Sequence, residues 1–165
     1  MQLVEGLATV EDVDAFVERL GTIGTEYGVA VQAFDARYVV DSEHLALAVD
    51  LANRETDRGE AIARDRAVEI LLYAAGRRQI NRAIEMGIDE GETPAVVVVD
   101  GGVESDEAAA AAAVADLLVP AETLGAFDRE GVLDFFDVTE RELAATDGTL
   151  ADLVRERVAL LVVER

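Results

Sequence analysis

Residues 94–100 (PAVVVVD) constrain the fold more than any other stretch of the chain. Four consecutive valines stand between a proline and Gly101, and a short, bounded run of β-branched residues favours a strand. Residues 29–35 (VAVQAFD) have a similar apolar density and predict a second strand. We predict two more strands, a short edge strand at residues 1–6 and a buried one in the second half of residues 67–75 (AVEILLYAA).

Helical patterns occupy most of the remaining chain. A helix is predicted after Thr9, which is a good N-cap, with an apolar face from Val10 to Leu20 and an end at Gly21 or Gly24. The other predicted helices cover residues 43–54 behind Ser42, residues 79–86 with Ile80, Ala83 and Ile84 inward, residues 105–119 behind Ser105, and two C-terminal segments begun by Thr139 with Glu142 and by Thr149 with Asp152. The last of these places Leu150, Leu153, Val154, Val158 and Leu161 on one face.

These elements predict an α+β fold, with a small, mostly antiparallel or mixed sheet of about four strands packed with about six helices. A chain of 165 residues suits one domain. We therefore expect a single domain spanning residues 1–165.

The charge composition limits the chemistry. The chain has 35 acidic and 14 basic residues, a formal charge of −21, and neither lysine nor cysteine. These absences exclude Schiff-base and Walker lysines, disulfides, thiolate metal sites and cysteine nucleophiles. An acidic, lysine-free composition is expected of a halophilic protein that works in molar salt. Because no apolar run approaches the roughly 20 residues needed to span a bilayer, we expect a cytoplasmic protein without membrane contact.

Positive charge is concentrated in one window. Seven arginines and five acids lie between Arg54 and Arg82, a net charge of +2, so the rest of the chain carries 7 − 30 = −23. Arginine binds phosphate bidentately and stacks on bases, which makes the window a candidate anion site. The alternative is that these arginines pair with carboxylates of the same chain.

Within this window, residues 69–80 (EILLYAAGRRQI) predict a buried strand that turns into a helix at Gly76. Such a bend would expose backbone N–H groups at a helix N-terminus, where an anion is favoured. Ala74 and Ala75 would allow a ligand to approach closely, and Gln79 offers a donor and an acceptor to a base edge. The alternative is a corner whose small residues serve packing alone.

Other residues give weaker signals. The single histidine, His44, lies two residues inside an apolar helix, with no second histidine or cysteine to complete a metal site. This position favours a structural or pocket-lining role over that of a general base or a metal ligand. Carboxylate pairs such as Glu140 with Glu142 and Glu90 with Glu92 could bind Mg²⁺, although such pairs arise by chance among 35 acids.

Residues 69–88 (EILLYAAGRRQINRAIEMGI) resemble the signature of the small kinase-associated regulatory subunit of the KEOPS complex, the TPRKB-like family. Residues 41–54 (DSEHLALAVDLANR) are similar to the histidine-containing helix that precedes this signature. Residues 136–146 (FDVTERELAAT) and 150–165 (LADLVRERVALLVVER) resemble the carboxy-terminal helices of the family. The resemblance covers nearly the whole chain.

The resemblance implies a non-catalytic subunit of the complex that installs threonylcarbamoyl on the adenosine after the anticodon of certain tRNAs. Two partners are implied, the complex's atypical kinase/ATPase subunit and the single-stranded 3′ CCA end of tRNA. No cofactor, metal ion, catalytic residue or DNA partner is expected. Two alternatives remain open: a structural scaffold of the same complex that does not touch RNA, and a carboxylate- and Mg²⁺-dependent hydrolase.

The resemblance also assigns residues to the tRNA end. Those that match the motif are Gly76, Arg78, Gln79 and Ile80, and those added on charge are Arg77 and Arg82. Three further residues are expected to line the pocket: His44, Tyr73 and Ala75. Ala75 stands where the family usually has serine, so a hydroxyl is missing at that position.

Overall fold

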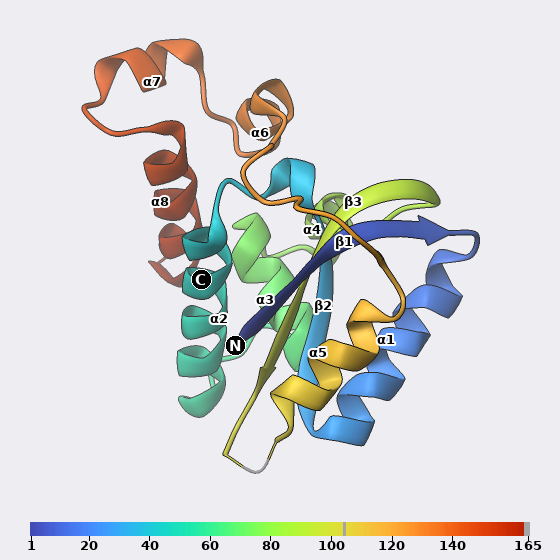
Figure 1. Cartoon of the computed structure of the whole chain (residues 1–165). Coiled ribbons are helices and arrows are strands. Elements are labelled where there is room, and N and C mark those ends of the chain that lie inside the picture. Colours follow the sequence, from blue (N-terminus) through green and yellow to red (C-terminus); the bar gives the residue numbers. More distant parts are fainter. Residues whose placement is uncertain (104, 164–165) are drawn as a thin grey trace. The chain divides into compact units, whose positions relative to one another are not determined.

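The computed structural model describes residues 1–103 and 105–163 and has an α+β fold with one four-stranded antiparallel sheet (Figure 1). This confirms the predicted fold class and strand number. The chain forms two compact units that alternate along the sequence. The first combines Met1–Ala36 with Gly87–Thr123, and the second combines Arg37–Met86 with the residues from Leu124 onward. A single domain over residues 1–165 stays a prediction.

The first unit contains the sheet, with strand order β2-β3-β1-β4. Its elements are β1 (Gln2–Val10), α1 (Val13–Tyr27), β2 (Val29–Asp35), β3 (Gly91–Gly101), α5 (Glu107–Ala115) and β4 (Val119–Pro120). Helices α1 and α5 lie side by side on one face of the sheet (Figure 1), where Ile23 and Val114 join Val97 and Val99 in the core. Val96 and Val98, which alternate with these strand residues, are also fully buried. Burial of both faces explains why β3 is a continuous apolar run rather than an alternating one.

The amino-terminal boundaries differ from the prediction. β1 is not a short edge strand, because it extends to Val10 and lies between β3 and β4. Thr9 therefore belongs to the strand, and Asp12 caps α1 by accepting a hydrogen bond from the Ala15 N–H at 3.2 Å. The helix continues past both predicted glycine stops to Gly28, which has a left-handed φ of 69°.

The second unit is helical. Its elements are η1 (Ala36–Tyr38, which begins on the last residue of the first unit's segment), α2 (Ser42–Asp57), α3 (Arg66–Ala75), α4 (Ile80–Ala83), η2 (Ile84–Met86), α6 (Arg129–Phe135), α7 (Glu140–Ala145) and α8 (Leu150–Val163). All five residues predicted for the inner face of α8 are buried, and the final two residues of that predicted helix lie outside the described part of the chain. Thr149 and Asp152 exchange hydrogen bonds at the start of α8, at 2.8 and 3.2 Å, as the capping box predicts.

The predicted strand within residues 67–75 is wrong, because the whole segment is helix α3. The Asp65 carboxylate caps it by accepting from the N–H groups of Ala67 and Val68. Seven of its ten residues are buried, and a short continuous apolar run cannot be assigned to strand or helix by pattern alone. The fourth strand is instead β4, which lies where the alanine-rich helix was expected to end.

The predicted helix over residues 79–86 is also wrong in detail. It is divided into the single turn α4 and the 3-10 turn η2. Ala83 is buried as predicted, but Ile80 and Ile84 are 50% and 58% exposed rather than inward. Two caps are shifted by one residue, since Asp41 caps α2 and Asp106 caps α5 in place of the neighbouring serines.

In the described part of the chain, we find no helix with both the length and the hydropathy required to cross a membrane.

Candidate functional site

The end of α3 determines the geometry around Gly76. Gly76 has a φ of 62° and closes the helix: its N–H donates to Tyr73 O at 3.1 Å, and the Arg77 N–H donates to Leu72 O at 3.0 Å. This is the left-handed cap for which glycine is preferred. The Gly76 and Arg77 N–H groups are therefore used within the helix cap and do not face a ligand.

The small residues before the glycine serve packing. Ala74 and Ala75 are at most 1% exposed, so neither offers its surface to a ligand. Gln79 precedes α4 without a side-chain cap bond, and α4 itself is a single turn of four residues. The exposed side chains of Arg78, Gln79 and Arg82, in contrast, carry polar groups that can contact a ligand.

Those side chains meet at one pocket. A pocket of about 320 Å³ is lined by Gly76, Arg77, Arg78, Gln79, Arg82 and Leu161. Five of these were predicted from sequence, and Leu161 of α8 was predicted only as a core residue. Ile80, the remaining predicted residue, is not among the lining residues but is half-exposed in the same segment.

The charge of this segment is distinctive. Residues 70–84 contain three arginines and no acid, a net charge of +3, whereas residues 54–69 contain four arginines and five acids, a net charge of −1. The upstream arginines are largely engaged: Arg54 pairs with Asp50 at 2.9 Å, and Arg58 lies 3.6 Å from Glu55. Pairing with nearby carboxylates thus accounts for Arg54 and Arg58, while Arg66 binds the side chain of Asn53.

Arg78 and Arg82 differ from these arginines. Both are exposed, and neither makes an ion pair or a side-chain hydrogen bond with any residue in 1–103 or 105–163. Arg77, in contrast, is held within the protein: its Nη2 donates to Phe135 O, and its guanidinium lies over the Phe135 ring. Among the three arginines of the segment, two are available to a ligand.

A family comparison covers this whole region. The family model for kinase binding protein CGI-121 matches residues 8–161. The chain belongs to the CGI-121 family. This match confirms the family resemblance found in the sequence, and the matched range includes every residue predicted for the site. A search of curated proteins finds no match.

In this CGI-121 family member, the residues expected to line the pocket beside the arginines lie elsewhere. His44 and Tyr73 are completely buried and Ala75 is 1% exposed, and none of the three is among the lining residues of the pocket at Gly76. His44 Nδ1 accepts from the Val40 N–H at 3.3 Å, and its Nε2 lies 2.8 Å from Ala74 O. Because the Ala74 carbonyl can only accept, the ring proton lies on Nε2. Nδ1 accepts a hydrogen bond and therefore carries no proton, so the ring is neutral.

Burial lowers the pKa of His44 to about 4, against the opposing effect of its hydrogen bond to Ala74. Asp41 raises the pKa of this histidine and Arg155 lowers it, but both effects are smaller. A buried, neutral histidine with both ring nitrogens bonded has a structural role, which agrees with the structural interpretation of this residue.

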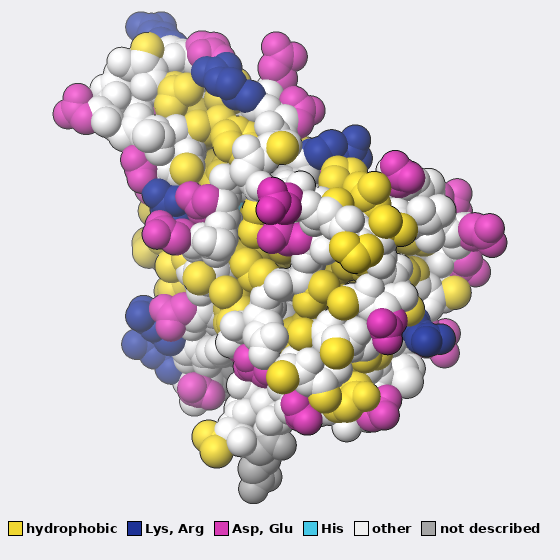
Figure 2. Space-filling view, in the orientation of Figure 1, with side chains coloured by type: hydrophobic (Ala, Val, Ile, Leu, Met, Phe, Trp, Pro, Cys, Tyr) yellow, Lys and Arg dark blue, Asp and Glu magenta, His cyan; other side chains and the backbone are white. Residues whose placement is uncertain are grey.

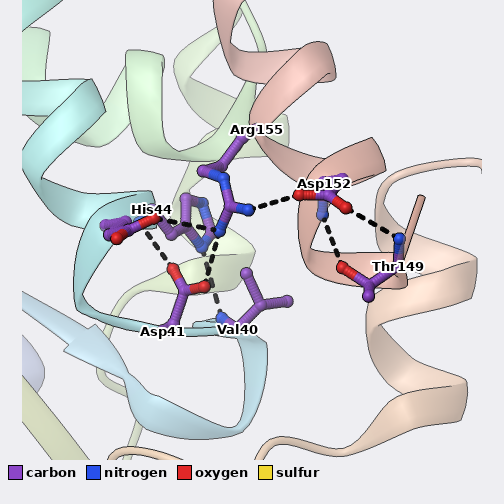
Figure 3. Close-up of polar contacts among 7 residues, drawn as sticks. Val40, Asp41, His44, Thr149, Asp152 and Arg155 are labelled. Carbon is purple, nitrogen blue, oxygen red and sulfur yellow. Dashed lines mark hydrogen bonds and ion pairs between the residues drawn. The ribbon is translucent and has the colours of Figure 1, made fainter.

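His44 belongs to a polar network that connects the starts of two helices (Figure 3). Asp41 accepts from the His44 N–H at 2.8 Å and pairs with Arg155 of α8 at 2.6 Å. Arg155 also binds Asp152, whose pKa is lowered by its hydrogen bond from the Thr149 backbone. The network thus fixes α8, which carries Leu161, to the amino end of α2.

The carboxylates suggested as Mg²⁺ ligands are engaged or scattered. Glu140 binds Arg129 and Glu142 binds Arg157 in the described structure. Across residues 1–103 and 105–163, no three carboxylate or histidine side chains gather closely enough to hold a metal ion. Figure 2 shows Asp and Glu side chains spread among neutral and apolar ones over the visible face. Most of the acid excess therefore belongs to the solvated surface.

Proposed function

We propose that the protein is a non-catalytic subunit of a KEOPS-type tRNA threonylcarbamoyladenosine complex. It binds the complex's atypical kinase/ATPase subunit and recruits tRNA through the single-stranded 3′ CCA end. Membership of a kinase-binding family supports the protein partner. The acidic, lysine-free composition supports action in a cytoplasm rich in salt.

The observation that carries the RNA proposal is the pair of unneutralised arginines beside one pocket. The chain has 35 acidic side chains with which an arginine could pair. Yet Arg78 and Arg82 line the pocket of about 320 Å³ without a carboxylate partner in the described residues. An electropositive pocket in a polyanionic protein favours an anionic ligand such as a phosphodiester.

The pocket has the side chains that an RNA terminus requires. Guanidinium groups can bind a phosphate through two parallel hydrogen bonds. Gln79 can donate to and accept from a base edge, and Ile80, which is 50% exposed in the same segment, can provide an apolar contact. Contacts to bases survive high salt better than phosphate contacts do, since phosphate binding weakens steeply as salt rises. A small end-binding pocket is therefore better suited to this protein than a wide basic groove.

The non-catalytic assignment is supported by the same residues. The one histidine is buried, there is no lysine or cysteine, and the carboxylates of α7 are bound to arginines. The histidine and these carboxylates would each have to break an existing hydrogen bond or ion pair before they could act on a substrate.

A charge-matched pair of variants tests the proposal. Arg78→Ala with Arg82→Ala should weaken tRNA binding by about 100-fold or more, because charge-assisted hydrogen bonds contribute about 1.5–3 kcal/mol each and about 1.4 kcal/mol is a factor of ten. The control is Arg19→Ala with Arg141→Ala, which removes the same charge from exposed arginines on α1 and α7. Fluorescence titration with intact tRNA should show little change for the control. Equal affinities of the two double variants, with intact kinase binding, would support the scaffold alternative instead.

A further inference from the structure

Arg77, from the loop that follows α3, and Arg157 of α8 meet at the carboxyl end of α6. The last carbonyls of a helix lack partners within the helix. Here Phe135 O accepts from Arg77, and Phe136 O and Asp137 O accept from Arg157 Nε and Nη2, each at 3.1 Å. The negative end of the helix dipole favours such cations. Three adjacent carbonyls are thus bound by two guanidinium groups.

Arg77 is fixed on several sides. Its guanidinium carbon lies 5.4 Å from the centre of the Phe135 ring, a distance that favours a cation–π contact. The Asp137 carboxylate lies 3.6 Å from its Nη2, and the side chain is only 25% exposed. Both the face and the charge of this guanidinium are therefore used inside the protein.

Arg157 links the same helix end to the pocket. A Cβ placed on Gly76 would lie 3.3 Å from Arg157 O, so the glycine packs against the backbone of α8. Arg157 also binds both oxygens of Glu142, at 2.8 and 3.0 Å. Leu161, one turn later in α8, lines the pocket. The α3 and α8 sides of the pocket are thus both attached to the end of α6.

We propose that Arg77 and Arg157 form a clamp on the α6 carbonyls that holds the pocket in shape, so that Arg77 positions the RNA-binding residues rather than contacting RNA. The RNA part rests on the proposed function, but the clamp itself can be measured without RNA. The roles of the two neighbouring arginines are then distinct: Arg78 contacts the ligand, and Arg77 acts through Phe135.

The salt dependence of binding separates these roles. Each phosphate contact to a single strand contributes about 0.7 to the slope of log K against log salt. Arg78→Ala should weaken binding and reduce the slope by about this amount. Arg77→Ala should weaken binding roughly tenfold with an unchanged slope. Arg77→Lys should bind as weakly as Arg77→Ala, because lysine keeps the charge but lacks the planar group that covers the Phe135 ring.

Hydrogen exchange tests the clamp without RNA. Phe135 is 4% exposed, so Phe135→Leu removes the ring beneath Arg77 without touching a ligand site. In this variant and in Arg157→Lys, the Gly76 and Arg77 amides that close α3 should exchange roughly tenfold faster. The control is Val114→Ala, which opens a space in the core of the first unit and should leave these two amides unchanged.

The outcomes are separable. If the wild-type protein fails to bind tRNA, the proposed function fails, while hydrogen exchange still decides the clamp. If Arg77→Ala lowers the salt slope and Arg77→Lys restores binding, Arg77 contacts phosphate and the positioning role is overturned. If Phe135→Leu and Arg157→Lys leave the Gly76 and Arg77 amides as protected as in the wild type, there is no clamp.

Discussion

The single histidine should make the stability of this protein depend on pH in a predictable way. His44 is completely buried, and its pKa falls from 6.5 to about 4 in the folded state. In the unfolded chain it regains its ordinary value, so between these pH values the unfolded state binds the extra proton. The contribution of neutral His44 to the free energy of unfolding is fully present above pH 6.5 and is lost as the pH falls toward 4. One pKa unit corresponds to 1.36 kcal/mol, which gives a loss of about 3 kcal/mol.

The structural cause of this loss is the bonding of the ring. Nδ1 accepts a hydrogen bond from the Val40 N–H, and a protonated ring would present a second donor there. The variant His44→Gln provides the control, because its amide can still donate toward Ala74 O but does not titrate. Both proteins have the same carboxylates, so the difference between their unfolding free energies cancels the carboxylate contribution to the pH dependence.

Urea denaturation at fixed salt, from pH 8 to pH 4, measures the difference. The free energy of unfolding of the wild type, relative to His44→Gln, should fall by about 3 kcal/mol over this range. Most of the fall should occur between pH 6.5 and pH 4. Parallel curves for the two proteins would show that His44 is not buried as a neutral ring, and the assigned hydrogen bonds would then be incorrect.

Three further outcomes are expected. Gly76→Ala should lower the unfolding free energy by about 1–2 kcal/mol, because it forces a side chain into left-handed backbone at the α3 cap; an unchanged Tm would contradict the assigned cap. Thr149→Ala should cost about 1 kcal/mol by removing the α8 capping box, measured by thermal unfolding, and a stabilised variant would exclude that cap. Arg78→Ala with Gln79→Ala should lose tRNA affinity while still co-purifying with the kinase partner, and loss of both activities would indicate a folding defect instead.

Local signals in the sequence predicted part of the fold well. The buried face of α8 and its Thr149 capping box depend on residues within a few turns of one another, and both were predicted. β3 was predicted because four valines have few alternatives to a strand. These features need no information from distant parts of the chain.

Features that depend on tertiary contacts were missed. The buried helix α3 was assigned partly to a strand because a short continuous apolar run fits a buried strand and a buried helix equally well. Arg77 was assigned to RNA on charge, although its partners Phe135 and Asp137 lie about 60 residues later in the chain. Five residues predicted from the family signature line one pocket although the local structure predicted for them was wrong, because the signature does not depend on the predicted strand; their role in RNA binding stays a prediction.

The most direct test is the affinity for tRNA with and without its three terminal nucleotides, measured at several molar KCl with the intact protein. We expect the trimmed tRNA to bind at least tenfold more weakly, because each base contact contributes about 1–3 kcal/mol. The Arg78 and Arg82 double variant should show no preference between the two tRNAs. Equal binding of intact and trimmed tRNA by the wild type would contradict recognition of the 3′ end.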